Sequence, residues 1–140
     1  KRAGYKTFCL TFNYGQRHKK EILYAEHLAR LTASPHKILK IRLPWKGSSL
    51  LDKNRPLPQD GIFGKIPTTY VPGRNTIFIS FAVSWAEAAG AEAIYIGANA
   101  IDFSGYPDCR PDYFRKYQSL IDIATKKKGI ELKVPLITKT

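Results

Sequence analysis

The chain has 140 residues, of which 44% are hydrophobic and 24% charged, and this is the composition of one globular domain with its own core. The net charge of +12 favours an anionic partner such as a phosphate, a nucleotide or a nucleic acid, although a solvated basic surface would also explain it. Two cysteines exclude a disulfide framework, and an apolar stretch over residues 76–89 is too short for a bilayer span of about 20 residues. No signal-peptide segment follows residues 1–4, so we expect a cytoplasmic protein.

The first part of the chain alternates strand and helix, as a parallel α/β sheet does. Residues 6–12 are apolar and β-branched, which predicts a buried strand with Cys9 packed in the core. Residues 19–31 carry an apolar stripe with a period near 3.6, which predicts an amphipathic helix. Residues 36–43 alternate apolar and basic side chains and predict a second strand.

A long irregular segment, residues 44–67, separates this part from the rest of the single domain that we expect over residues 1–140. Segments of this length are typical of functional lids, and a short helix is one option over residues 48–53. A helix apolar on nearly every side is then predicted over residues 76–89, ending at Gly90, with a strand over 93–96.

The last part of the chain predicts a helix over residues 112–128 and a strand over 131–134. Pro111 suits the first turn of this helix and Gly129 its end. Its expected buried face consists of Tyr113, Phe114, Tyr117, Leu120, Ile121 and Ala124. The run Lys126 to Lys128 would lie in the last turn and interact with the helix dipole, which we favour over contact with nucleic acid.

Two polar clusters stand where helices begin. In residues 13–18, NYGQRH, Gly15 permits a turn, while Arg17 and His18 stand at a helix start; a solvent-facing turn explains them equally well. In residues 71–75, VPGRN, Gly73 can adopt positive φ, and Arg74 suits an anion beside the helix N-terminus. Asn75 could be an ordinary N-cap.

The third cluster is residues 97–114, GANAIDFSGYPDCRPDYF, which follow a predicted strand. Gly97 and Gly105 would let the backbone turn and approach a ligand closely. Asp102 and Asp108 could bind a metal, accept a ligand N–H or act as a base. Cys109 precedes Arg110, which would favour a thiolate, but a packed side chain is the preferred interpretation. The density of polar groups in one loop predicts a ligand site.

Together these clusters resemble the 7-cyano-7-deazaguanine synthase family. The matching motifs are FNYGQRH at residues 12–18, TTYVPGRN at 68–75, GA at 97–98 and DFSGYPDCR at 102–110, in the family's order and spacing. The resemblance implies a Rossmann-like parallel sheet with flanking helices, of the PP-loop ATP-pyrophosphatase class. It also implies an ATP-dependent carbon–nitrogen ligase that converts 7-carboxy-7-deazaguanine and ammonia to the nitrile, through an amide, with Mg²⁺ accompanying ATP.

The resemblance assigns three groups of residues. A catalytic group consists of Arg74, Asp108 and Arg110. A substrate-binding group consists of Asn75, Asp102, Ser104, Tyr106 and Asp108. A nucleotide-binding group consists of Tyr14, Gln16, Arg17, His18, Gly73 and Gly97. The resemblance also implies a homodimer and no nucleic-acid or membrane partner.

Several departures from the family pattern are visible. The family's Ser-Gly-Gly-x-Asp-Ser nucleotide loop would precede residue 1, and its four-cysteine Zn²⁺ site would follow residue 140, so we expect a central, inactive piece of the enzyme. Asn13 stands where the family commonly has Asp. Lys139 sits earlier than the family's phosphate-contacting lysine would.

Other functions stay open at this point. One is another PP-loop enzyme that thiolates tRNA or forms an amide. A second is a basic module that binds nucleic acid through Arg17, Lys19, Lys20 and Lys126 to Lys128, with affinity falling steeply with salt. A third is a homologue that attaches deazaguanine-like groups to protein or DNA.

Overall fold

The structure, a computed structural model, describes residues 4–16, 19–44, 70–99 and 106–138. The option of a helix over residues 48–53 and nearly all of the segment 44–67 lie outside these ranges. The chain divides into two compact units, Lys1–Pro56 and Leu57–Thr140, each with its own pair of parallel strands. The fold class is therefore α/β, while one continuous Rossmann-like sheet remains a prediction. Within the described ranges, no helix combines the length and apolar content needed to cross a bilayer.

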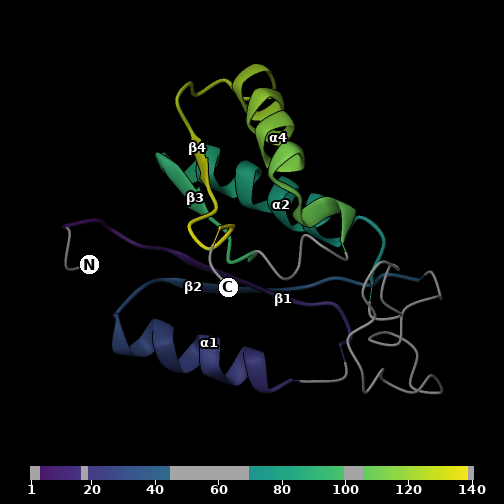
Figure 1. Ribbon diagram of the computed structural model, residues 1–140. Coiled ribbons are helices and arrows are strands. Elements are labelled where there is room, and N and C mark those ends of the chain that lie inside the picture. Colours follow the sequence, from purple (N-terminus) through teal and green to yellow (C-terminus); the bar gives the residue numbers. More distant parts are fainter. Residues whose placement is uncertain (1–3, 17–18, 45–69, 100–105, 139–140) are drawn as a thin grey trace. The chain divides into compact units, whose positions relative to one another are not determined.

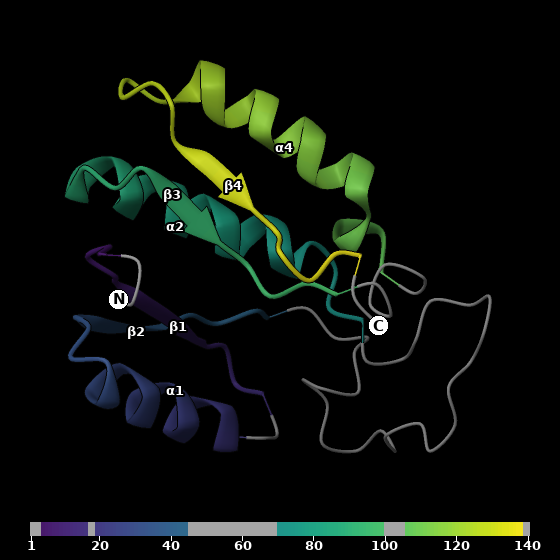
Figure 2. The same cartoon turned by 60° about the vertical axis from the view of Figure 1, so that its left-hand side comes forward.

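The first unit consists of β1 (Cys9–Asn13), α1 (Lys20–Leu31) and β2 (His36–Lys40). The two strands pair in parallel, in register from the first residue of each to the last. Figures 1 and 2 both show α1 lying alongside this pair of strands. The predicted strand–helix–strand order is confirmed, with both strands shorter than expected.

The apolar stripe predicted for α1 is only partly buried. Ile22 and Ala29, two helical turns apart, are buried, but Leu23, Leu28 and Leu31 are 58–69% exposed. Two five-residue strands offer a narrow face, which covers a single line of helix side chains. Cys9 is likewise half-buried rather than a core residue, which corrects its predicted place.

The second unit contains α2 (Arg74–Ala89), β3 (Ala93–Tyr95), the 3₁₀ turn η1 (Pro107–Cys109), α4 (Pro111–Ala124) and β4 (Glu131–Lys133). Strands β3 and β4 pair in parallel, and Figure 2 shows α2 and α4 beside them. The predicted order of elements is confirmed. Helix α2 begins two residues earlier than predicted because the left-handed residue Gly73, at φ 64°, is its N-cap.

The core of the second unit is one cluster of buried side chains from α2, α4 and the segments around them: Ile79, Ala86, Ala98, Cys109, Phe114, Tyr117, Ile121 and Ile130. Two expectations were wrong in detail. Helix α2 is not buried on every side, since Phe81 is 42% exposed. On α4, Leu120 and Ala124 lie outside the buried face, because the core covers only the line through Phe114, Tyr117 and Ile121.

Candidate functional site

A buried polar clasp joins the start of α2 to η1. Its members are Asn75, Asp108 and Cys109. The backbone N–H of Asn75 donates to Oδ2 of Asp108 at 2.9 Å. The side-chain amide of Asn75 donates to the backbone oxygen of Asp108 at 3.0 Å and to Sγ of Cys109 at 3.1 Å.

The clasp supplies what the sequence of α2 lacks at its N-terminus. The first N–H groups of a helix have no partner within the helix, and Gly73, at the N-cap, has no side chain to accept from them. The Asp108 carboxylate accepts from one of them, and its negative charge suits the positive end of the helix dipole. The interpretation of Asn75 as an ordinary N-cap was therefore wrong, because its side chain reaches forward to η1.

All three members of the clasp are 2–7% exposed. Burial of polar groups is costly unless they are hydrogen-bonded, so the clasp fixes the relative position of α2 and η1. Cys109 belongs to the core cluster, which confirms that it is a packed side chain.

Two pairs of hydroxyl groups hold α2 parallel to α4. Oγ1 of Thr76 lies 2.9 Å from Oη of Tyr113, and one turn further along both helices Oγ of Ser80 lies 2.7 Å from Oη of Tyr117. Residue numbers rise together along the two helices, so both begin at the same end, as Figure 2 also shows.

Burial raises the pKa of Tyr113 to about 12, with smaller contributions from the charges of Tyr117, Asp108 and Cys109. The hydrogen bond with Thr76 acts in the opposite direction. The raised pKa extends the pH range over which the phenol keeps its proton and the hydroxyl pair stays uncharged.

Two arginines stand at this shared end of the helices. Arg74 is the first residue of α2 and half-buried, and Arg110 directly precedes α4 and is exposed. Helix N-termini favour anions, and the arginine fork matches carboxylates and phosphates. This end of the second unit thus brings two guanidinium groups together with the carboxylates of Asp108 and Asp112.

A stacked pair of tyrosines lies beside the clasp. The rings of Tyr70 and Tyr106 have centroids 5.9 Å apart and planes inclined by 25°. The N–H of Gly73 donates to Oη of Tyr70 at 3.4 Å, and the N–H of Cys109 donates to the backbone oxygen of Tyr106 at 3.0 Å. The site residues predicted from the sequence include Tyr106 but not Tyr70. The position of Tyr70, two residues before the Pro72-Gly73 turn, could have indicated that it belongs to the site.

The polar turn after β1, in the first unit, is closed by a glutamine. Oε1 of Gln16 accepts from the N–H of Tyr14 at 3.0 Å, and Nε2 donates to the backbone oxygen of Phe12 at 3.1 Å. Tyr14 and Gln16 are both buried, and Gly15 has φ 85°. The predicted residues Arg17 and His18 lie outside the described ranges.

The second unit brings together six of the predicted site residues: Gly73, Arg74, Asn75, Tyr106, Asp108 and Arg110. Gly97 precedes Ala98 of the core cluster and does not adopt positive φ, so backbone strain gives no reason for a glycine there. Asp102, Ser104 and Gly105 lie outside the described residues.

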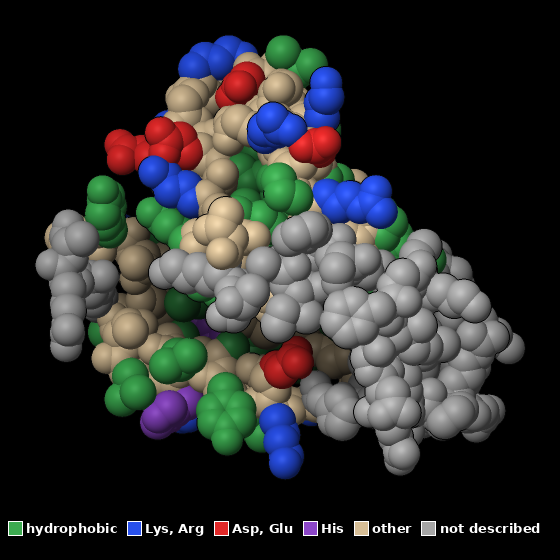
Figure 3. All heavy atoms as spheres, in the orientation of Figure 1, with side chains coloured by type: hydrophobic (Ala, Val, Ile, Leu, Met, Phe, Trp, Pro, Cys, Tyr) green, Lys and Arg blue, Asp and Glu red, His purple; other side chains and the backbone are tan. Residues whose placement is uncertain are grey.

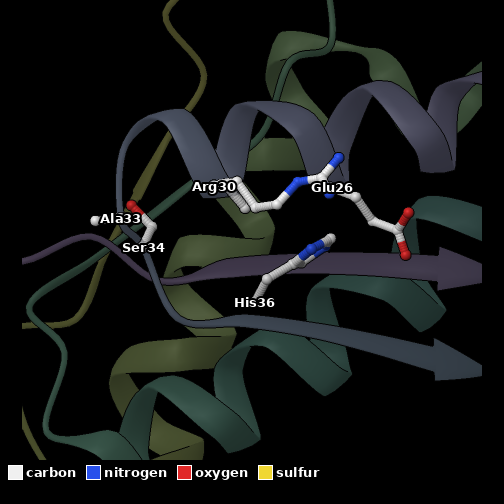
Figure 4. A pocket seen from close by; sticks show the side chains of 6 residues that line it. Glu26, Arg30, Ala33, Ser34 and His36 are labelled. Atoms are coloured by element: carbon white, nitrogen blue, oxygen red, sulfur yellow. The ribbon is translucent and has the colours of Figure 1, made fainter.

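A shallow pocket of about 390 Å³ lies elsewhere, in the first unit. Figure 4 shows Glu26 and Arg30 reaching it from α1 and His36 from β2. The imidazole Nε2 of His36 lies 2.9 Å from Oγ1 of Thr11, so this ring also ties the two strands together. The pocket contains no predicted site residue.

The described residues contain no group of three or more His, Cys, Asp or Glu side chains placed to hold a metal ion. Mg²⁺ takes oxygen ligands, and the carboxylate of Asp108 already accepts from Asn75. Within the described residues, the candidate site therefore offers no set of ligands that can be assigned to a metal ion.

Two lysines of the basic run near the C-terminus cap helices. Helix α4 ends at Ala124, so Lys126 to Lys128 follow the helix instead of forming its last turn, as was wrongly predicted. Nζ of Lys127 donates to the carbonyl of Gly90, and Nζ of Lys128 donates to those of Asp122 and Thr125. In Figure 3 the face over α4 carries both blue and red side chains, so it is no single-sign patch.

The chain is similar in sequence to known proteins. The family described as "Queuosine biosynthesis protein QueC" matches residues 1–140. Among curated relatives, 7-cyano-7-deazaguanine synthase of Nitrosospira multiformis is 50% identical over 133 residues, covering 94% of this chain and 57% of the relative.

Two further relatives with the same name are equally similar. The protein of Prochlorococcus marinus strain MIT 9215 is 51% identical, covering 98% of this chain and 64% of its own length. That of Microcystis aeruginosa is 50% identical, covering 95% of this chain and 59% of its own length. The chain therefore spans about three-fifths of the relatives that it matches.

Proposed function

The chain belongs to the QueC family of queuosine biosynthesis proteins, and from this premise we propose that the whole protein is a 7-cyano-7-deazaguanine synthase. It would use ATP to activate the carboxylate of 7-carboxy-7-deazaguanine. Ammonia would convert the activated acid to an amide, and a second activation would dehydrate the amide to the nitrile. The names of the relatives, at 50–51% identity over nearly the whole chain, support this reaction.

The observation that carries the proposal is the clasp between α2 and η1. It places Arg74 and Arg110 at the joined starts of two parallel helices. Both the acid substrate and ATP are anions, and activation moves negative charge onto the leaving phosphate groups. Preorganised cations and helix N-termini stabilise such charge without reorganising during the reaction.

We assign the residues accordingly. Arg74 and Arg110 bind the carboxylate or the phosphates, which makes them the catalytic pair. Asn75 and Asp108, buried and bonded to each other, act as positioning residues that keep the two arginines in place. Tyr106 contacts the deazaguanine base, together with Asp102 and Ser104 from the segment outside the described ranges.

The nucleotide half of the site remains a proposal from the family. Tyr14, Gln16, Arg17, His18, Gly73 and Gly97 would contact ATP. Mg²⁺ and Zn²⁺ are expected in the whole protein, but the described residues do not fit either ion, so no step is assigned to them. A homodimer is also proposed, and sedimentation of the whole protein tests it.

The test is production of the nitrile by the whole protein. Purified protein is supplied with the acid, ammonia and ATP, and products are identified by mass spectrometry. We expect the nitrile, with the amide accumulating when ATP is limiting. Omission of ammonia should stop the reaction. Attachment of the base to protein or DNA, with no free nitrile, would replace this function by that of a modifying homologue.

A further inference from the structure

We propose that Tyr70, stacked on Tyr106, is a base-contacting residue that presents an aromatic face to a purine-like ring. This inference rests on the proposed function, since it supplies that site with a contact for the base. It is carried by the geometry of the two rings and by what each ring is tied to.

The two tyrosines are held in place from opposite sides of the clasp. The hydroxyl of Tyr70 accepts from Gly73, the residue before Arg74. The backbone of Tyr106 accepts from Cys109, the residue before Arg110. Each tyrosine, Tyr70 through its hydroxyl and Tyr106 through its backbone, is therefore linked to one of the two segments that carry the arginines.

The two rings stack on each other, and Tyr106 also packs against the core cluster. They are nearly parallel, inclined by 25°, with centroids 5.9 Å apart, while the rings of Tyr113 and Phe114 meet edge to face at 76°. Tyr70 and Tyr106 are half-buried, whereas Tyr117 of the core is 7% exposed. A near-parallel, half-buried pair in the segments that carry the two arginines suits a flat heterocycle that bears a negative substituent.

Two substrates of the proposed reaction carry such a ring. One is the deazaguanine of the acid, and the other is the adenine of ATP. Both are flat bicyclic bases attached to a negatively charged group, so the stacking chemistry is shared. Separate binding measurements for each compound distinguish the two sources.

The experiment compares ring and non-ring residues at position 70 of the whole protein. Tyr70→Phe keeps the ring and loses the hydroxyl, whereas Tyr70→Leu removes the ring. Dissociation constants of the acid and of a non-hydrolysable ATP analogue are measured by calorimetry. We expect Tyr70→Leu to weaken one of them roughly tenfold or more, and Tyr70→Phe to change neither by more than about threefold. Tyr95→Leu, on β3 and 66% exposed, is the matched control.

The outcomes separate this inference from the proposed function. If Tyr70→Leu binds the acid or the ATP analogue more weakly, while Tyr70→Phe and Tyr95→Leu do not, the proposed stacking is supported. The compound whose binding weakens is then the one that stacks on Tyr70. Unchanged binding of both bases overturns the proposed stacking, even when the wild type makes the nitrile. If Tyr70→Leu does not fold, Tyr70→Trp replaces it. The acid or the ATP analogue should then quench the tryptophan fluorescence of this variant more than that of the wild type. Equal fluorescence changes in the two proteins overturn the proposal. Failure of the wild type to make the nitrile overturns the function, while the binding result still tests the stack.

Discussion

Both units place polar residues near the start of a helix, but they secure them differently. In the turn after β1, Gln16 bonds to residues two and four positions away. At the start of α2, Asn75 bonds to residues 33 and 34 positions away. The first turn is closed by its own sequence, whereas the second is closed by a distant segment that the core brings to it.

This difference has a functional meaning. A turn closed by local hydrogen bonds can form without the rest of the unit, so the positions of its polar groups depend little on how the rest of the unit is packed. The clasp forms only when η1 and α4 are packed on α2, and the arginines are then presented together. Disrupting the clasp should therefore affect activity and stability jointly, and disrupting the turn should affect mainly stability.

The largest effect is expected from Asp108→Ala in the whole protein. The change leaves the buried N–H of Asn75 without an acceptor, which costs about 2 kcal/mol in the free energy of unfolding. It also removes one of the three hydrogen bonds between η1 and α2, which should displace η1 and abolish nitrile formation. Denaturant unfolding and the nitrile assay measure the two effects.

Two variants sharpen the result. Asp108→Asn keeps an oxygen that can accept from Asn75 and should recover most of the stability. Asp112→Ala makes the same truncation at an exposed carboxylate paired with Arg115 and should change neither quantity appreciably. Full activity in Asp108→Ala would refute the joint dependence on the clasp.

Arg74→Ala should lower activity while leaving the hydrogen bonds of the clasp intact. We expect kcat/KM for nitrile formation to fall by about 10²-fold or more, because a preorganised positive group is lost. Stability should change less than in Asp108→Ala, since the Asn75–Asp108 bonds remain. Steady-state kinetics and unfolding curves give both numbers.

Arg74→Lys keeps the charge but not the planar fork, so it should recover only part of the rate. Arg115→Ala, on the exposed face of α4, serves as the control. Wild-type kinetics in Arg74→Ala would remove this residue from the proposed site.

The sequence allowed much of each unit to be predicted, for reasons that are local. The period of residues 19–31 and the glycine at position 90 determine a helix and a helix end without reference to other segments. The motifs VPGRN and PDCR also identified which residues would cluster. Local patterns could not show that the Asn75 amide and the Asp108 carboxylate bond to each other, because that depends on packing between segments 33 residues apart.

The burial of individual faces was predicted less well for the same reason. Leu28 and Phe81 are apolar at helical spacing, yet they are exposed, because the neighbouring elements of each unit do not cover these faces of the helices. The stacking of Tyr70 on Tyr106 likewise joins two segments that lie far apart in the sequence. Such pairings become visible only in three dimensions.

Gln16→Ala tests the locally closed turn after β1. The change removes two hydrogen bonds within the turn and leaves the N–H of Tyr14 buried, so the protein should lose about 1 kcal/mol of stability. If Gln16 also contacts ATP, KM for ATP should rise, with kcat close to that of wild type. Gln16→Glu keeps an acceptor for Tyr14 but places a buried carboxylate oxygen against the carbonyl of Phe12, so it should be at least as destabilised as Gln16→Ala. A loss of kcat as large as that of Arg74→Ala would show that the reaction depends on this turn as much as on the clasp.

The smallest effect is expected from Tyr113→Phe, and it appears at alkaline pH. The pKa of Tyr113 is raised from 10.0 to about 12, so the folded protein retains the proton over a range in which the unfolded chain has lost it. Stability is therefore lost as pH rises from about 10 to 12, because the unfolded state binds fewer protons there. The phenylalanine variant lacks this titration. The difference in unfolding free energy between wild type and variant should thus be constant below pH 9. Above pH 10 the wild type should lose stability relative to the variant. Since Tyr113 is only half-buried, solvent screening keeps the shift small. A difference that stays constant up to pH 12 would show that the hydroxyl pair with Thr76 lies in a more solvated place than the clasp beside it.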